Sequence, residues 1–182
     1  MYKRQILHAA LDNDAKHIII SLGGIGSFDG GAGMLQALGA KFYDDEANLV
    51  DVTKGAHVIK YIRRLDFSGI HPKLAEANIQ VMSDFSSRLY GKQSEIMQMY
   101  PMLGMTQNEA AEIDNLVWYF SELFKSELRV TIGPIERGGA GGGIAAVLKG
   151  LYQAEILTSH ELVDQITHLE DLVQQADLII FG

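Results

Sequence analysis

Hydrophobic and polar residues follow two different periods along this chain, and together the periods predict alternating helices and strands. Residues 54–64 fit either a helix or a strand, and we favour a short helix to about residue 60 and an extended segment at 62–67. Residues 85–105 are irregular and rich in methionine. Elsewhere the pattern predicts helices at residues 6–11, 34–38, 107–124 and 144–153 and after 71 and 158, and strands at residues 18–20, 41–43, 78–82, 129–132 and 177–182.

This alternation over the whole length predicts a single α/β domain, residues 1–182. We expect a mixed or mostly parallel sheet with flanking helices. Ligands of such sheets bind beyond the carboxyl ends of the strands. Residues that follow a predicted strand are therefore the first candidates for function.

The first candidate is a glycine-rich loop between the strand at 18–20 and the helix at 34–38. Backbone N–H groups and the positive end of a helix dipole converge on such a loop, which suits it to bind an anion, although a purely structural glycine turn is the alternative. The loop carries one acid, Asp29, which we take as a candidate catalytic residue. The candidate anion-binding residues here are Gly24, Ser27, Gly30 and Gly31.

The second candidate region combines Asp84, which follows the strand at 78–82, with a glycine loop at residues 136–143. Asp84 is either a carboxylate linked to Mg2+ or a turn-forming residue. The loop fits a dinucleotide pattern, but no suitably placed acid follows it, which disfavours a dinucleotide site. We expect Asp29, Asp84 and this loop to converge on one cleft, with Ser86, Arg137, Gly138, Gly139 and Gly141 as further anion-binding candidates.

Composition excludes several classes of function. The net charge of −8 leaves no basic surface for nucleic acid. The absence of cysteine excludes disulfides and thiolate metal sites, and no apolar run is long enough to span a membrane, so we expect a cytoplasmic protein. The 6 histidines include no H-x-x-x-H pair, so no residue is assigned as a metal ligand. Trp118, predicted to face away from the apolar stripe of its helix, suggests a homo-oligomer or another partner.

Several of these motifs together carry a resemblance to a known family. The run D-G-G-A-G-M-L-Q-A-L-G-A at residues 29–40, with S-L-G-G at 21–24, is similar to the signature of the glycerate kinase family. Members of that family phosphorylate D-glycerate with ATP. Further matches follow in order at residues 65–70, Asp84, 138–143 and 176–182.

The resemblance implies the smaller domain of a two-domain kinase, incomplete at both ends relative to the family. It implies ATP and Mg2+ as cofactors and D-glycerate or a similar hydroxy acid as substrate. Asp29 would activate the substrate hydroxyl or hold Mg2+, Asp84 would take the other role, and the loop around Arg137 would approach phosphates. We expect this chain alone to be inactive and the intact protein to be the enzyme.

The sequence departs from the family pattern at several polar positions. The family's Ser-Ala-Thr-Asn becomes I-G-S-F at residues 25–28, and its Pro-Gln-Lys-Gly becomes P-M-L-G at 101–104, which removes a cation that Arg137 could replace. Polar groups position and stabilise charge in phosphoryl transfer, so their loss lowers its rate. The alternative function is therefore a non-catalytic member that binds a small hydroxy acid or serves as a structural partner domain.

Overall fold

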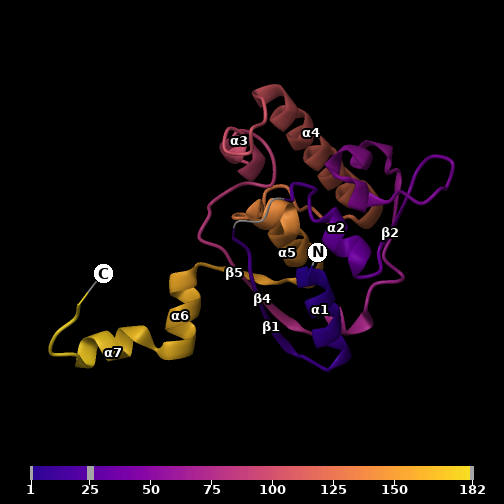
Figure 1. Cartoon of the computed structure of the whole chain (residues 1–182). Coiled ribbons are helices and arrows are strands. Elements are labelled where there is room, and N and C mark those ends of the chain that lie inside the picture. Colours follow the sequence, from indigo (N-terminus) through magenta and orange to yellow (C-terminus); the bar gives the residue numbers. More distant parts are fainter. Residues whose placement is uncertain (1, 24–26, 181–182) are drawn as a thin grey trace.

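Most of the predicted elements are present in the computed structural model, which describes residues 2–23 and 27–180 (Figure 1). The strands are β1 (His17–Ser21), β2 (Lys41–Tyr43), β3 (Arg64–Asp66), β4 (Asn78–Met82) and β5 (Glu155–Leu157). The α-helices are α1 (Tyr2–Asp12), α2 (Ala32–Ala37), α3 (Glu95–Met99), α4 (Gln107–Leu123), α5 (Ile144–Tyr152), α6 (Ser159–Thr167) and α7 (Leu169–Gln175). Short 3-10 or π turns are η1 (Val52–Lys54), η2 (Ala56–Tyr61), η3 (Pro72–Leu74), η4 (Phe124–Leu128) and η5 (Ala140–Gly143).

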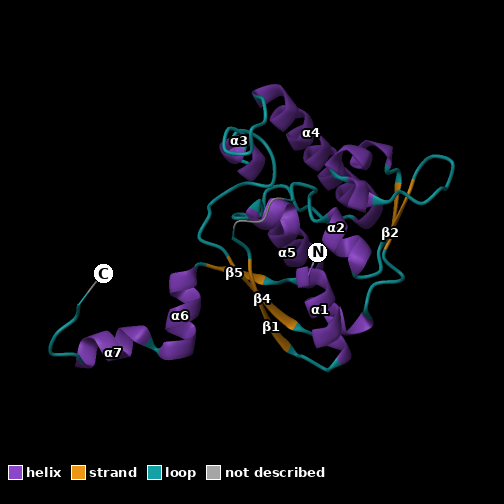
Figure 2. Ribbon diagram, viewed as in Figure 1, coloured by secondary structure: helices purple, strands orange, loops and turns teal. Residues whose placement is uncertain are grey.

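Three strands form a parallel sheet in the order β1-β4-β5, and β2 and β3 form a separate antiparallel pair (Figure 2). β1 and β4 pair in the register Ile18 with Ile79 and Ile20 with Val81. The predicted α/β fold with a mostly parallel sheet is confirmed. Because the strands are parallel, the loops that follow β1, β4 and β5 leave from the same edge of the sheet.

Two groups of buried side chains hold the elements in place. One lies between the sheet and helices α1 and α5 and includes Leu11, Val81 and Leu148, each fully buried. The other surrounds α2, α4 and the β2-β3 pair, where Phe120 contacts Phe42 edge to face with ring centroids 5.7 Å apart. These two groups of side chains support the glycine-rich loop that follows β1 and the glycine loop at residues 136–143.

Local sequence signals mark the helix starts correctly. Thr106 and Glu109 form a capping box at the start of α4, and Thr158 and Glu161 form another at the start of α6. The ambiguous stretch is helical in η2 and extended in β3, as favoured from the pattern. Trp118 on α4 is 48% exposed, which confirms that it faces away from the apolar stripe.

Two predicted strands are wrong. Residues 129–132 follow the π turn η4, and Arg129 has a left-handed φ of 58°, so the chain bends there and Ile132 is buried without joining a strand. Residues 177–180 carry a strand pattern, but they are exposed and form no strand, since no strand of the described chain lies beside them. Apolar character alone cannot form a strand that lacks a pairing partner.

Among the strands and α-helices, β5, α3 and the separate helix α7 were not predicted. β5 has only three residues, too few to show a period, and α3 is a five-residue helix inside the stretch expected to be irregular. After β5, α6 lies against the sheet, where Gln80 of β4 donates to Gln165 at 3.1 Å, and α7 extends away from the rest of the molecule (Figure 1). Among the described residues, no helix combines the length and the apolar character that crossing a membrane requires.

Candidate functional site

The carboxyl edge of the parallel sheet brings together the segments that were predicted to converge. Asp84 comes two residues after β4, and α6 begins two residues after β5. The two glycine loops also meet. Gly143 lies against Gly30, and a Cβ added to Gly142 would overlap the carbonyl of Ser27, so glycine is required there for packing.

Asp29 holds the start of α2. Its carboxylate accepts the N–H of Gly31 at 3.0 Å through Oδ1 and the N–H of Gly33 at 2.9 Å through Oδ2. Gly30 and Gly31 have φ of 64° and 82°, and this bend of the backbone turns the N–H groups of Gly31 and Gly33 toward Asp29. The anionic group that these two amides hold in the structure is the side chain of Asp29 itself.

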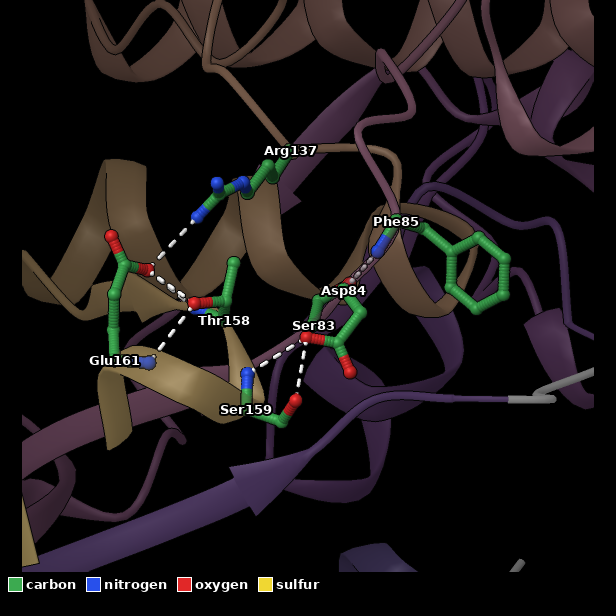
Figure 3. Close-up of polar contacts among 7 residues, drawn as sticks. All are labelled: Ser83, Asp84, Phe85, Arg137, Thr158, Ser159 and Glu161. Atoms are coloured by element: carbon green, nitrogen blue, oxygen red, sulfur yellow. Dashed lines mark hydrogen bonds and ion pairs between the residues drawn. The ribbon is translucent and has the colours of Figure 1, made fainter. Parts of the chain in front are cut away.

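Asp84 joins the end of β4 to the start of α6 (Figure 3). One carboxylate oxygen, Oδ1, accepts both the backbone N–H of Ser159 at 2.8 Å and its hydroxyl at 2.9 Å. These bonds, the backbone one first, lower the pKa of Asp84, and the charge of Arg137 adds to the effect. The Ser83 hydroxyl accepts the N–H of Phe85 at 3.4 Å, whereas the bonds that Asp84 accepts come from Ser159, 75 residues further along the chain.

Arg137 lies on the same side of the site and is directed toward α6. Its guanidinium donates to the carboxylate of Glu161 at 3.2 Å, as Figure 3 shows. Glu161 also accepts the N–H and hydroxyl of Thr158, and these bonds lower its pKa first, with Arg137 as a smaller cause. The predicted phosphate-binding arginine is therefore placed near Asp84 but is paired with an acid.

Residues 138–143 of the second glycine loop are buried, and their backbone N–H groups donate within the chain. Gly138 donates to the carbonyl of Ile135 and Gly139 to the carbonyl of Ser87, each at 3.1 Å. Ser87, the buried neighbour of the predicted Ser86, is thus the serine that meets this loop, whereas Ser86 itself is exposed.

Glu95 is a residue of the site that the sequence analysis missed. This acid on α3 is only 6% exposed, and its carboxylate accepts the N–H of Gly142 at 3.0 Å and a second bond from Gly141. Burial raises its pKa, and the two backbone bonds oppose that rise only in part. The one signal in the sequence was that Glu95 is the single acid of the methionine-rich stretch at residues 85–105.

The site therefore consists of amide groups that donate to acids of the same chain. Asp29 accepts N–H groups at the start of α2, Glu95 of α3 accepts those of the second glycine loop, and Asp84 accepts that of Ser159 at the start of α6. Ser27 is half-buried and contributes its carbonyl to the contact between the loops. Gly24, the remaining predicted residue, lies outside the described residues. Asp84 and Arg137 form the more exposed side of the arrangement.

Comparison with known proteins identifies the family of the chain. The sequence profile of the glycerate kinase family matches residues 4–182. The chain is 32% identical over 178 residues to a glycerate kinase of Halalkalibacterium halodurans and, over the same length, to a glycerate 2-kinase of Escherichia coli. Each alignment covers 98% of this chain and 46% of the relative.

A solved structure shows the same relation. The crystal structure of a protein assigned as glycerate kinase 2 from Salmonella typhimurium LT2 superposes with a TM-score of 0.86 at 31% identity. It covers 96% of this chain and 46% of that protein. The chain thus spans about half the length of the curated relatives it matches. With its profile match over nearly the whole length and its α/β fold, this chain belongs to the glycerate kinase family.

Proposed function

We propose that this chain supplies one side of a phosphoryl-transfer site and that, in the intact protein, the site phosphorylates D-glycerate with ATP. The observation that carries the proposal is the placement of Asp29 and Asp84 after neighbouring parallel strands of a glycerate kinase fold. Because the chain spans about half the length of its relatives, the remaining half would close the site, and the chain alone would be inactive.

The two acids differ in what they can do. The lowered pKa of Asp84 makes it a weak base that stays ionised. Its side chain is exposed, and both bonds from Ser159 go to Oδ1 and not to Oδ2. We assign Asp84 to the metal and Asp29 to the substrate hydroxyl. Two amide bonds fix the orientation of Asp29, as a proton acceptor in such a site requires.

The donors present fit the cofactors that the family implies. An exposed carboxylate is a suitable ligand for Mg2+, which binds oxygen and neutralises charge on the phosphates of ATP when it is present. Arg137 is the cation near Asp84 that could meet a phosphate, and to do so it would exchange Glu161 for the nucleotide. A guanidinium has enough donors to contact both during that exchange.

A coupled assay of the intact protein with ATP, Mg2+ and D-glycerate tests this assignment. We expect Asp29→Asn to lower kcat by at least about 100-fold, since a positioned acid–base group contributes roughly that factor. Asp84→Asn should lower kcat as well, because it removes a charged oxygen ligand of Mg2+. Asp45→Asn, at an exposed turn position, is the matched control and should keep full activity. Unchanged turnover in Asp29→Asn would remove Asp29 from the reaction.

A second candidate function is supported by the occupied amides. The N–H groups of Gly31, Gly142 and Ser159 already donate to acids of the same chain, so a site with these contacts offers few donors to an incoming phosphate. This favours a non-catalytic member that binds a small hydroxy acid or serves as a partner domain. Calorimetry of the intact protein that showed D-glycerate binding, with no ATP-dependent turnover, would identify this case.

A further inference from the structure

Two histidines and one aspartate meet on the surface beside the amino ends of β1 and β4. His8 and Asp12 lie four residues apart on α1 and therefore share a helix face. His71, immediately before η3, joins them from a distant part of the chain. The Nδ1 of His8 lies 3.1 Å from Asp12 Oδ2, and the Nε2 of His71 lies 3.2 Å from Asp12 Oδ1.

Each separation has the length of one edge of a metal coordination polyhedron, and the two edges end on different oxygens of Asp12. At metal–ligand distances of about 2.0–2.2 Å, neighbouring ligand atoms in tetrahedral or octahedral sites lie about 3.0–3.5 Å apart. One ligand atom from each of the three residues lies within 4.8 Å of the other two. The imidazole rings of His8 and His71 are nearly perpendicular, at 87°, so their nitrogens can approach one point without stacking.

We propose that His8, Asp12 and His71 form a binding site for a divalent transition metal of the Zn2+ or Ni2+ class. Two imidazole nitrogens and one carboxylate oxygen are the donors that these ions prefer, and the exposed side chains of His8 and Asp12 leave further positions to water. Mg2+ is a poor occupant because it favours oxygen ligands. The site is built on α1 and η3 and is distinct from the acids at the carboxyl edge of the sheet.

The cluster has a structural role without metal and a different one with it. Hydrogen bonds from His71 and then from His8 lower the pKa of Asp12. The bond between His71 and Asp12 also links α1 to the segment before β4, and this structural role needs no metal. A metal would displace protons from the same nitrogens, and binding would tighten as the pH rises. Lys73 forms an ion pair with Asp14 at 2.7 Å, and its positive charge also interacts with Asp12. This charge opposes the binding of a cation at the cluster.

His71 sets the expected affinity. Its Nδ1 is buried and has no hydrogen-bond partner among the described residues, whereas a metal-binding imidazole normally donates that N–H to an acceptor. Loss of such a partner weakens metal binding by about 10–100-fold. We therefore expect micromolar rather than nanomolar binding of Zn2+ or Ni2+.

Isothermal titration of the protein, purified without a histidine tag, with ZnCl2 and NiCl2 tests the site. We expect one ion per chain and at least about tenfold weaker binding in His71→Ala and in His8→Ala. His160→Ala, an exposed histidine on α6, is the matched control and should bind as the wild type does. Absence of binding, or equal binding by His71→Ala and the wild type, would overturn the proposal.

Two further measurements separate a metal site from a folding effect. Circular dichroism in EDTA confirms that each variant is folded, and His8→Ala provides a change at a half-exposed side chain. Electron paramagnetic resonance with Cu2+ reports the ligands directly, and two coordinated imidazole nitrogens are expected. A spectrum without nitrogen coupling would overturn the assignment of the histidines. None of these readouts depends on ATP or D-glycerate, so failure of the metal site would not affect the proposed kinase function.

Discussion

Replacement of Glu95 by alanine tests whether the second glycine loop depends on an internal anion. The change removes the acceptor of two buried N–H groups, those of Gly141 and Gly142. Each buried donor left without a partner costs about 1–3 kcal/mol, so the lost bonds amount to about 2–6 kcal/mol. The loss of stability is partly offset because the variant no longer buries a desolvated charge, whose cost is indicated by the raised pKa of Glu95. A water molecule in the vacated space would bond the two N–H groups and offset more of the loss.

We therefore expect Glu95→Ala to lower the free energy of unfolding by about 2–4 kcal/mol. In a chain of 182 residues this corresponds to a fall in Tm of roughly 5–15 °C. Urea unfolding followed by far-UV circular dichroism measures the change. Glu112→Ala, at an exposed position of α4, is the matched control and should stay within about 0.5 kcal/mol of the wild type.

Glu95→Gln separates the hydrogen bonds from the charge. The amide oxygen can still accept an N–H, and the side chain carries no charge at any pH. Because burial raises the folded pKa above its usual 4.5, Glu95 lowers wild-type stability as the pH rises from 4.5 through the folded pKa. That decline should be absent from Glu95→Gln. If Glu95→Ala and Glu112→Ala have the same stability, the glycine loop does not need its internal carboxylate and the reasoning is refuted.

Three further predictions concern stability. Gly142→Ala should lower the free energy of unfolding by at least about 2 kcal/mol, because φ is 65° and the added Cβ would overlap a backbone carbonyl. Gly104→Ala, at φ 71° with open space around it, should lower it by only about 1–2 kcal/mol, and equal losses in thermal unfolding would contradict the packing argument. Phe120→Ala should cost about 3–5 kcal/mol in urea titration because the ring is fully buried, and Trp118→Ala on the same helix should cost far less; a small loss for Phe120 would show that the core can close around the gap. Below pH 4.5 the wild type should lose stability as acids with a lowered pKa are protonated, and Asp84 contributes to this loss as the pH falls below its usual pKa of 3.8. Asp84→Asn should therefore reduce the slope of Tm against pH in that range. An unchanged slope would mean that the bonds from Ser159 do not favour the charged form of Asp84.

Local chemistry explains which elements could be predicted from the sequence. The β-branched run at 18–20, the strand at 78–82 and the capping box at Thr106 depend on neighbours within a few residues, and each is present in the structure. The strand expected at 177–182 is absent from residues 177–180, because a strand requires a partner and the pairing partner is a property of the fold; residues 181–182 lie outside the described residues. The three-residue β5 succeeds for the same reason, because β4 lies beside it.

The sequence by itself determined the α/β class, the family signature and the position of Asp29 and Asp84 after parallel strands. The tertiary structure alone decided which groups face one another. It placed Glu95 under the second glycine loop, Ser159 on Asp84, and His71 beside His8 and Asp12, across separations of 47, 75 and 59 residues between the bonded partners. No period or motif encodes such contacts, because they depend on how distant elements pack and on which buried amide or imidazole then needs a partner.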